Sequence, residues 1–160
     1  MRGTDHGAAT FRHTEPMNSE VVRPCLVPEL TVTDIEVSRE FWCSLLGFVV
    51  KYDRPEEGFA YLTLGTAHLM LDQAGLGRTW STGPLARPFG RGVNFEIAVD
   101  SVEPVLQRLS DAKWPLFAEP EEKRYGVGDT KVGVIQFLVQ DPDGYLLRLS
   151  QPLDQRGPGT

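Results

Sequence analysis

Short apolar runs separated by turn residues dominate the chain between residues 26 and 152. Some of them, such as "LVPELTV" and "AHLMLDQ", have apolar residues at every second position, which is typical of a strand with one buried face. A longer run has helical spacing instead and ends at Gly47, where a glycine favours a helix stop. The first half of this region therefore predicts strands at 26–32, 48–53, 59–65 and 67–73, with one helix between the first two.

The predicted helix has a clear start and a clear apolar stripe. Thr33 or Asp34 provides a side chain of the type that caps helix N-termini. The stripe that we expect to face the core consists of Val37, Phe41, Leu45 and Leu46. Gly65 and Thr66 form the tight turn between the third and fourth strands.

The second half of the region repeats this order at an offset of about 67 residues, from Asp34 to Ser101. Asp100 or Ser101 caps a second helix, and Pro104 lies in its first turn, where a missing N–H does no harm. The turn Asp-Pro-Asp-Gly at 141–144 leads into the last strand. The predicted strands are 93–100, 114–119, 132–141 and 145–151, and the helical stripe is Val102, Val105, Leu106 and Leu109.

This repetition predicts an α+β fold made of two βαβββ repeats, with a curved, cup-like mixed sheet and helices on its outer face. We expect one domain at 23–153, with repeat one at 26–73, a Gly/Pro-rich linker at 74–91 and repeat two at 92–152. Residues 1–22 and 154–160 are polar and aperiodic, and we expect a disordered arm and a disordered tail.

Strand parity separates a core face from a mixed face. In the last strand Leu147 and Leu149 lie on one side, whereas Arg148 lies on the other with Leu146 and Ser150. The same parity predicts that Leu26, Pro28, Leu30 and Val32 pack under the first helix, and that Val93, Phe95, Ile97 and Val99 pack under the second. The opposite faces hold acids, an amide, aromatic rings and a methionine, which suits a ligand cup better than a core.

Composition and net charge restrict the kinds of binding partner that the protein can have. The chain has 160 residues and a formal net charge of −6, which argues against nucleic acid or an anionic membrane as its main partner. No apolar run is long enough for a membrane span, and the first residues lack the apolar segment of a signal peptide. The two cysteines, Cys25 and Cys43, have no metal or redox spacing, so we expect a protein of the reducing cytoplasm.

Three motifs resemble the vicinal oxygen chelate superfamily, which comprises glyoxalases, bleomycin-resistance proteins and dioxygenases: "LTVTDIEVSREFWCSLLGF", "VNFEIAVDSVEPVLQRLSDAKWPLF" and "FLVQDPDGYLLRLSQ". The resemblance implies the cup fold predicted above. It also implies four positions at which family enzymes hold a divalent metal, one on the first and one on the last strand of each repeat. Those positions hold Val27, Met70, Asn94 and Arg148 in this chain.

These four residues favour loss of the metal site. Valine and methionine do not bind hard metal ions, asparagine is a weak ligand, and arginine brings a permanent positive charge. A shift of strand register would leave Glu29, His68, Asp72 and Glu96 as alternative ligands. Two of the three histidines, His6 and His13, lie in the predicted arm, so no Ser-His-Asp or Cys-His arrangement is supported.

The pattern most resembles the metal-free bleomycin-resistance branch, whose members are homodimers that sequester a bulky cationic antibiotic in clefts at the dimer interface. The resemblance implies a homodimer without a cofactor, with aromatic rings for flat groups and carboxylates for cations. We predict no metal-binding or catalytic residue. The predicted ligand-binding residues are Glu29, Phe59, Tyr61, Met70, Trp80, Asn94, Glu96, Gln136 and Arg148.

Two other functions stay open at this point. One is an enzyme of the same fold, a lyase, isomerase or dioxygenase that acts on a small metabolite. The other is a binding module of a larger assembly. The ligand itself cannot be inferred from the sequence, because loops shape the pocket.

Overall fold

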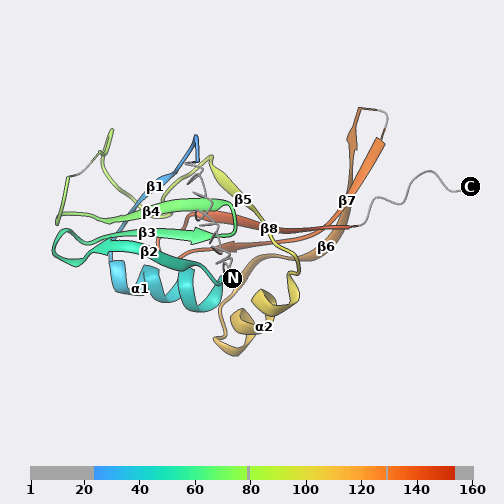
Figure 1. The fold of residues 1–160 in the computed structure, drawn as a ribbon, viewed down its shortest axis with the longest axis horizontal. Coiled ribbons are helices and arrows are strands. Elements are labelled where there is room, and N and C mark those ends of the chain that lie inside the picture. Colours follow the sequence, from blue (N-terminus) through green and yellow to red (C-terminus); the bar gives the residue numbers. More distant parts are fainter. Residues whose placement is uncertain (1–23, 79, 129, 154–160) are drawn as a thin grey trace, which may run out of the picture.

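The computed structural model describes residues 24–78, 80–128 and 130–153 and contains two four-stranded sheets. Each sheet comes from one half of the chain (Figure 1). The first half forms β1 (Glu29–Val32), α1 (Ile35–Arg39), β2 (Val49–Arg54), β3 (Phe59–Leu64) and β4 (Ala67–Gln73). The second half forms β5 (Asn94–Ala98), α2 (Glu103–Asp111), β6 (Leu116–Val127), β7 (Thr130–Gln140) and β8 (Leu146–Pro152).

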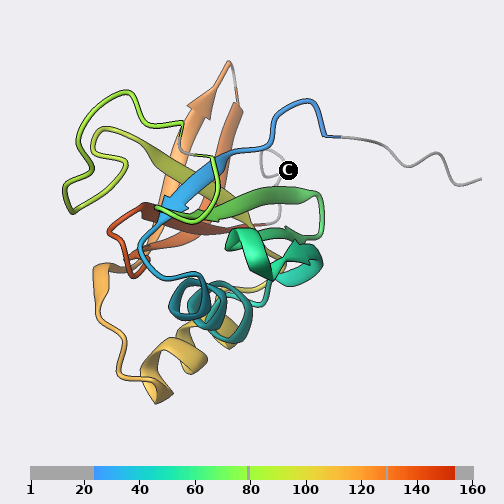
Figure 2. The ribbon, with the colours of Figure 1, turned by 90° about the vertical axis from the view of Figure 1, so that its left-hand side faces the viewer.

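The two sheets have the same topology. Their strand orders are β1-β4-β3-β2 and β5-β8-β7-β6. In each sheet the first strand is parallel to the last, and the other neighbours are antiparallel. Both helices lie on the same side of the molecule in two perpendicular views (Figures 1 and 2). This confirms the predicted α+β fold of two βαβββ repeats. Within the described residues, no helix has the length and apolarity needed to cross a membrane.

One hydrophobic core joins the helices to one face of both sheets. It includes Trp42, Leu62 and Leu71 from the first repeat and Phe137 and Leu149 from the second. We call this side of each sheet its helix face and the opposite side its open face. Parity correctly placed Leu147 and Leu149 on the helix face and Arg148 on the open face.

The first helix starts and stops where the sequence predicts. The Asp34 carboxylate accepts hydrogen bonds from the backbone N–H groups of Glu36 and Val37, and Gly47 ends the helix with φ = +89°. After Arg39 the helix continues as a π-helical segment, Glu40–Leu45, in which the N–H of Leu46 reaches the carbonyl of Phe41.

Three predicted core positions are wrong. Val37 is exposed, because Trp42 joins Phe41 and Leu46 in the core and centres the buried stripe on Ser38 instead. Leu26 is 81% exposed, because β1 begins only at Glu29 and the chain before it has no strand partner over most of its length. Val93, just ahead of β5, is also exposed.

The second helix buries most of its predicted stripe, but its N-cap residue is Val102 and not Asp100 or Ser101 as predicted. Val102, Val105 and Leu109 are buried, and Ser101 Oγ accepts a hydrogen bond from the backbone of Glu103. A matching glutamine ends each repeat. Gln73 Oε1 accepts a bond of 2.9 Å from the Ile35 N–H, and Gln151 Oε1 accepts one of 3.1 Å from the Val102 N–H.

The hairpin of β6 and β7 is longer than predicted. The sequence predicts strands at 114–119 and 132–141, whereas β6 runs to Val127 and β7 starts at Thr130. The charged stretch at 119–124 lacks the apolar alternation of a strand because the side chains on both faces of β6 are exposed there. Figure 1 shows the hairpin extending away from both helices.

The segment between the repeats is tied to the rest of the fold by Asp143. This carboxylate, 1% exposed, accepts bonds from the Thr33 backbone at 2.9 Å, the Thr33 hydroxyl at 2.7 Å and the Arg87 guanidinium at 2.8 Å. Nearby, the Phe89 ring contacts Tyr145 edge to face. Asp143 therefore links the end of β1, the linker and the turn before β8.

Candidate functional site

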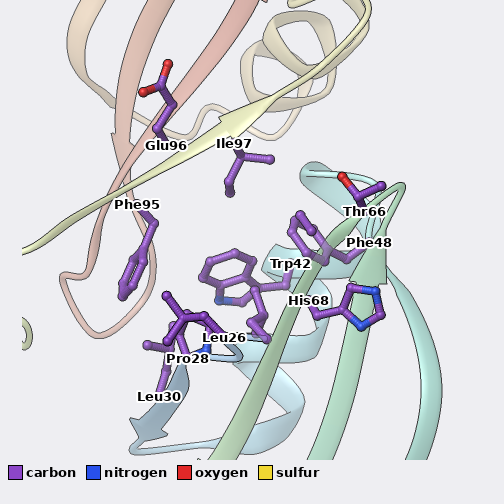
Figure 3. Close-up of a pocket in the computed structure, with 12 residues that line it drawn as sticks. Leu26, Pro28, Leu30, Trp42, Phe48, Thr66, His68, Phe95, Glu96 and Ile97 are labelled. Carbon is purple, nitrogen blue, oxygen red and sulfur yellow. The ribbon is translucent and has the colours of Figure 1, made fainter. Parts of the chain in front are cut away.

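An apolar pocket of about 200 Å³ lies between the two sheets (Figure 3). Trp42 and Phe48, both buried, form its inner wall. In Figure 3 Phe95 and Ile97 point from β5 toward Trp42, whereas the Glu96 side chain points away. Its lining residues are Leu26, Pro28, Leu30, Trp42, Phe48, Thr66, Ala67, His68, Leu69, Phe95, Glu96 and Ile97.

Most of this wall comes from helix faces and not from the open faces where parity placed the predicted ligand residues. Of the nine predicted residues, only Glu96 lines the pocket. The indole N–H of Trp42 is not available to a ligand, because it donates a hydrogen bond to the Asp141 carboxylate at 3.3 Å. The pocket can hold a small apolar group, and its polar lining residues are Thr66, His68 and Glu96.

Asp141, beneath this tryptophan, is the strongest electrostatic feature of the core. Burial raises the pKa of its carboxyl to about 6, although bonds from the Tyr145 backbone, the Trp42 ring and the Asp143 backbone act in the opposite direction. Tyr145 is affected in turn, since burial raises the pKa of its hydroxyl to about 12. Both groups pack between the repeats and hold the turn before β8.

The open face of the first sheet brings three predicted residues into one row. Glu29, Met70 and Tyr61 lie opposite one another on the adjacent strands β1, β4 and β3. The hydroxyl of Tyr61 is 2.9 Å from Nδ1 of His68, which fixes the tyrosine ring. Phe59 lies beside them on β3, opposite Asp72, and burial raises the pKa of the Asp72 carboxyl.

Tyr52 is the residue of this face that the sequence did not reveal. Simple alternation along β2 would place it with Val50 on the helix face. A β-bulge inserts Lys51 between the pairs Val50–Leu62 and Tyr52–Tyr61, and this reverses the direction of every later side chain. Tyr52 therefore stacks on Tyr61 with 5.0 Å between ring centroids. No local signal in the sequence marks the bulge.

The open face of the second sheet carries the charged and amide residues. Arg148 forms a salt bridge to Glu96, its partner across the parallel strands β8 and β5. Gln136, 4% exposed, donates to Glu121 at 2.9 Å and bonds the hydroxyl of Tyr125. Glu121 and Tyr125 belong to the hairpin that the sequence underestimated.

The four residues that the resemblance assigns to metal positions have side chains poorly suited to a divalent ion. Arg148 places its guanidinium on this face and binds Glu96, the nearest carboxylate by register. Val27 has no donor atom in its side chain, Met70 offers only a thioether, and Asn94 is exposed. Among the described residues, no three His, Cys, Asp or Glu side chains are placed to hold an ion.

The predicted residues thus form two groups, one on each open face. Glu29, Phe59, Tyr61 and Met70 lie on the first sheet, and Asn94, Glu96, Gln136 and Arg148 on the second. Between these groups the described side chains show no hydrogen bond, ion pair or ring contact. Trp80 lies in the linker, 71% exposed, with Arg78 5.4 Å from its ring centroid.

Comparison with known sequences and structures places these features in context. The sequence profile of the Glyoxalase/Bleomycin resistance protein/Dioxygenase superfamily matches residues 22–149. No functionally curated protein matches the chain.

Several solved structures are similar. A glyoxalase/bleomycin resistance protein/dioxygenase superfamily member from Vibrio splendidus 12B01 is 40% identical, with 79% of this chain and 97% of that chain covered and a TM-score of 0.37. A virulence protein from Salmonella typhimurium is 20% identical over 83% of this chain and 99% of its own, with a TM-score of 0.58. TioX from Micromonospora sp. ML1 is 20% identical over 79% and 98%, with a TM-score of 0.60.

Proposed function

Because this chain belongs to the glyoxalase/bleomycin resistance protein/dioxygenase superfamily, we propose that it binds a small molecule without modifying it. The salt bridge between Arg148 and Glu96 carries this proposal. The Arg148 guanidinium lies at a position where the family's enzymes are expected to hold a metal cation. It also pairs with the Glu96 carboxylate, which would otherwise be free to bind a cation. An open face without a metal ion can still bind a small molecule, and this is the function that we propose.

The ligand that we propose is bulky and cationic, of the bleomycin type. Glu29 is exposed on the open face of the first sheet, and no ion pair or hydrogen bond of its side chain occurs among the described residues. A free carboxylate beside Met70 and Tyr61 suits a cationic group with an apolar or flat neighbour. Sequestration of an antibiotic in the cytoplasm would make this a resistance protein, and both cysteines are free thiols, in keeping with a reducing compartment.

We further propose that two copies form the binding cleft. The two groups of predicted residues make no contact with each other among the described side chains of one chain, and a second copy would let an open face of each kind line a larger cleft. β1 and β5 are edge strands in their sheets, with one side unpaired in the strand order. Unpaired edges and exposed apolar residues such as Leu26 favour association.

Titration calorimetry with metal-free bleomycin tests the proposal. We expect saturable binding, one ligand per chain, and recovery of chemically unchanged ligand by mass spectrometry. Glu29→Gln should weaken binding by about fivefold through loss of one exposed charge interaction, whereas Glu119→Gln, an exposed charge on the hairpin, serves as the matched control. A chemically altered ligand would favour the enzyme alternative. Absence of binding to bleomycin and to other cationic glycopeptides would refute the resistance proposal.

A further inference from the structure

The open face of the first sheet carries a stack of three aromatic rings that spans β2 and β3. Figure 1 shows these two strands side by side. Tyr52 contacts both of the other rings: its ring centroid is 5.0 Å from that of Tyr61, with 20° between the planes, and 6.0 Å from that of Phe59, with 30°. These are offset-stacked geometries. We call Tyr52, Phe59 and Tyr61 the aromatic platform.

Of the three rings of the platform, Tyr52 is the one that is exposed to solvent. Phe59 and Tyr61 are 6% and 9% exposed, whereas Tyr52 is 47% exposed. Tyr61 is held by its bond to His68, and the Arg54 guanidinium covers Phe59 at 3.8 Å from the ring centroid. The Tyr52 ring therefore has a fixed base and a surface open to solvent, which a planar group can cover by stacking.

Cations border the platform on both sides, but only one of them lacks a partner. Arg54 bonds Glu57 at 2.7 Å and lies near Asp72. Lys51 lies 5.7 Å from the centroid of Tyr61, and no carboxylate lies within ion-pair distance of it among the described side chains. The unpaired charge nearest the platform is therefore that of Lys51, next to Tyr61. The unpaired carboxylate of this face, Glu29, lies on β1, two strands away from β3.

For a group bound at the platform, the attraction of an anion to Lys51 outweighs the repulsion from the net negative charge of the chain. The net charge of −6 is spread over the molecule, and charges farther than about 8–10 Å are screened at physiological salt. A contact with Lys51 is shorter than this screening length. The face thus combines a stacking surface with a nearby cation.

We propose that the aromatic platform is a binding site for planar aromatic anions, such as aryl carboxylates. The ring of the ligand stacks on Tyr52, and its carboxylate lies next to the Lys51 ammonium. The site shares Phe59 and Tyr61 with the predicted ligand-binding residues, but it uses Tyr52 and Lys51 in place of Glu29 and Glu96, to which the proposed function assigns cationic groups. It also lies within a single chain, so it requires neither bleomycin binding nor a dimer.

Titration of the full chain with 2-naphthoate, followed by NMR and by the fluorescence of the probe, tests this site. Neutral 2-naphthamide and cationic 2-naphthylmethylammonium provide the charge series. We expect affinity to fall in the order anion, neutral, cation, and the difference to shrink in 0.5 M salt, where screening is stronger. Signals of Tyr52 and Lys51 should move on binding.

Two variants separate the two parts of the site. Tyr52→Leu keeps an apolar cover over Phe59 and Tyr61 but removes the stacking ring, and should weaken 2-naphthoate binding about fivefold. Lys51→Gln should weaken it about threefold and abolish the preference for the anion over the amide. Phe117→Leu and Lys123→Gln, an exposed aromatic and an exposed lysine on β6, are the matched controls and should change nothing.

The result that would overturn the proposal is equal affinity for the three probes, unchanged affinity in Tyr52→Leu, or no binding of 2-naphthoate at millimolar concentration. In those cases the stack only stabilises the edge strand β2. Each of these results is independent of the bleomycin titration, so failure of one proposal does not imply failure of the other.

Discussion

The Arg148 guanidinium bonds the Glu96 carboxylate across two parallel strands of the second sheet. Both side chains are partly open to solvent, Arg148 at 28% and Glu96 at 47%. Arg148 also carries a buried Nε–H without a hydrogen-bond partner. The pair is therefore neither a strong buried ion pair nor a loose surface contact.

Replacing this arginine should have two small and opposite effects. Arg148→Met removes a partly exposed ion pair, so we expect a loss of less than about 1 kcal/mol in the free energy of unfolding. The same change leaves Glu96 uncompensated and should increase affinity for a cationic ligand such as bleomycin. Urea denaturation and calorimetry measure the two effects. Identical stability and identical affinity in parent and variant would show that Arg148 is only a solvated charge.

Divalent metals should not bind stoichiometrically at the four family positions. Elemental analysis of protein purified without chelator should find well below one equivalent of zinc, iron, manganese or nickel per chain. Arg148→Glu restores a carboxylate at one position but should not create a site, because Val27 and Met70 still lack suitable donors. About one equivalent of metal, lost on mutation of His68 or Glu96, would contradict this prediction.

The protein should sediment as a dimer at micromolar concentration. The expected mass is twice the 17.8 kDa of one chain, because two copies can cover the edges of β1 and β5 and the exposed side chains near them. Leu26→Glu, beside the pocket between the sheets, should weaken association, whereas Leu85→Glu in the linker is the control. A protein that stays monomeric at all concentrations would refute the proposal that two chains form the binding cleft.

Asp141 should make stability depend on pH. Its pKa is about 6 in the folded protein because of burial, above the value of about 4 in an unfolded chain. The folded state therefore binds the proton more tightly, so the contribution of Asp141 is fully present below pH 4 and is lost as the pH rises to about 6. Over this pH range, ionisation of Asp141 should lower the free energy of unfolding by about 3 kcal/mol.

Comparison with Asp141→Asn isolates this contribution. Asparagine cannot ionise, so the difference in free energy of unfolding between parent and variant should shift in favour of the variant as the pH rises from 4 to 6. Urea denaturation at several pH values measures it. A difference that does not vary with pH would exclude the raised pKa.

Asp143 should matter more for stability than its cationic partner. Asp143→Ala leaves the Thr33 N–H and hydroxyl without their buried acceptor, and should cost about 3 kcal/mol. Arg87→Ala removes a partly exposed guanidinium and should cost about 1 kcal/mol. Thermal and urea unfolding of both variants test the order. Equal losses would mean that Arg87, and not the bonds to β1, holds the turn.

The sequence by itself determined the repeat, the helices and most strand faces of this protein. These features depend on local chemistry, because hydrophobic periodicity sets which side of an element is buried and capping residues such as Asp34 and Gly47 set its ends. The turn at Asp141–Gly144 and the placement of Arg148 on the open face follow from the same rules. Local signals suffice wherever a residue's neighbours along the chain decide its environment.

Tertiary structure alone decided what the side chains meet. The partner of Arg148 depends on the register of two strands 52 residues apart in sequence, and the position of Tyr52 depends on a bulge that only pairing with β3 creates. The pocket at Trp42 exists because two separate sheets share one core. Such features follow from non-local packing, in which distant segments compete for the same space, and no pattern within one segment contains that information.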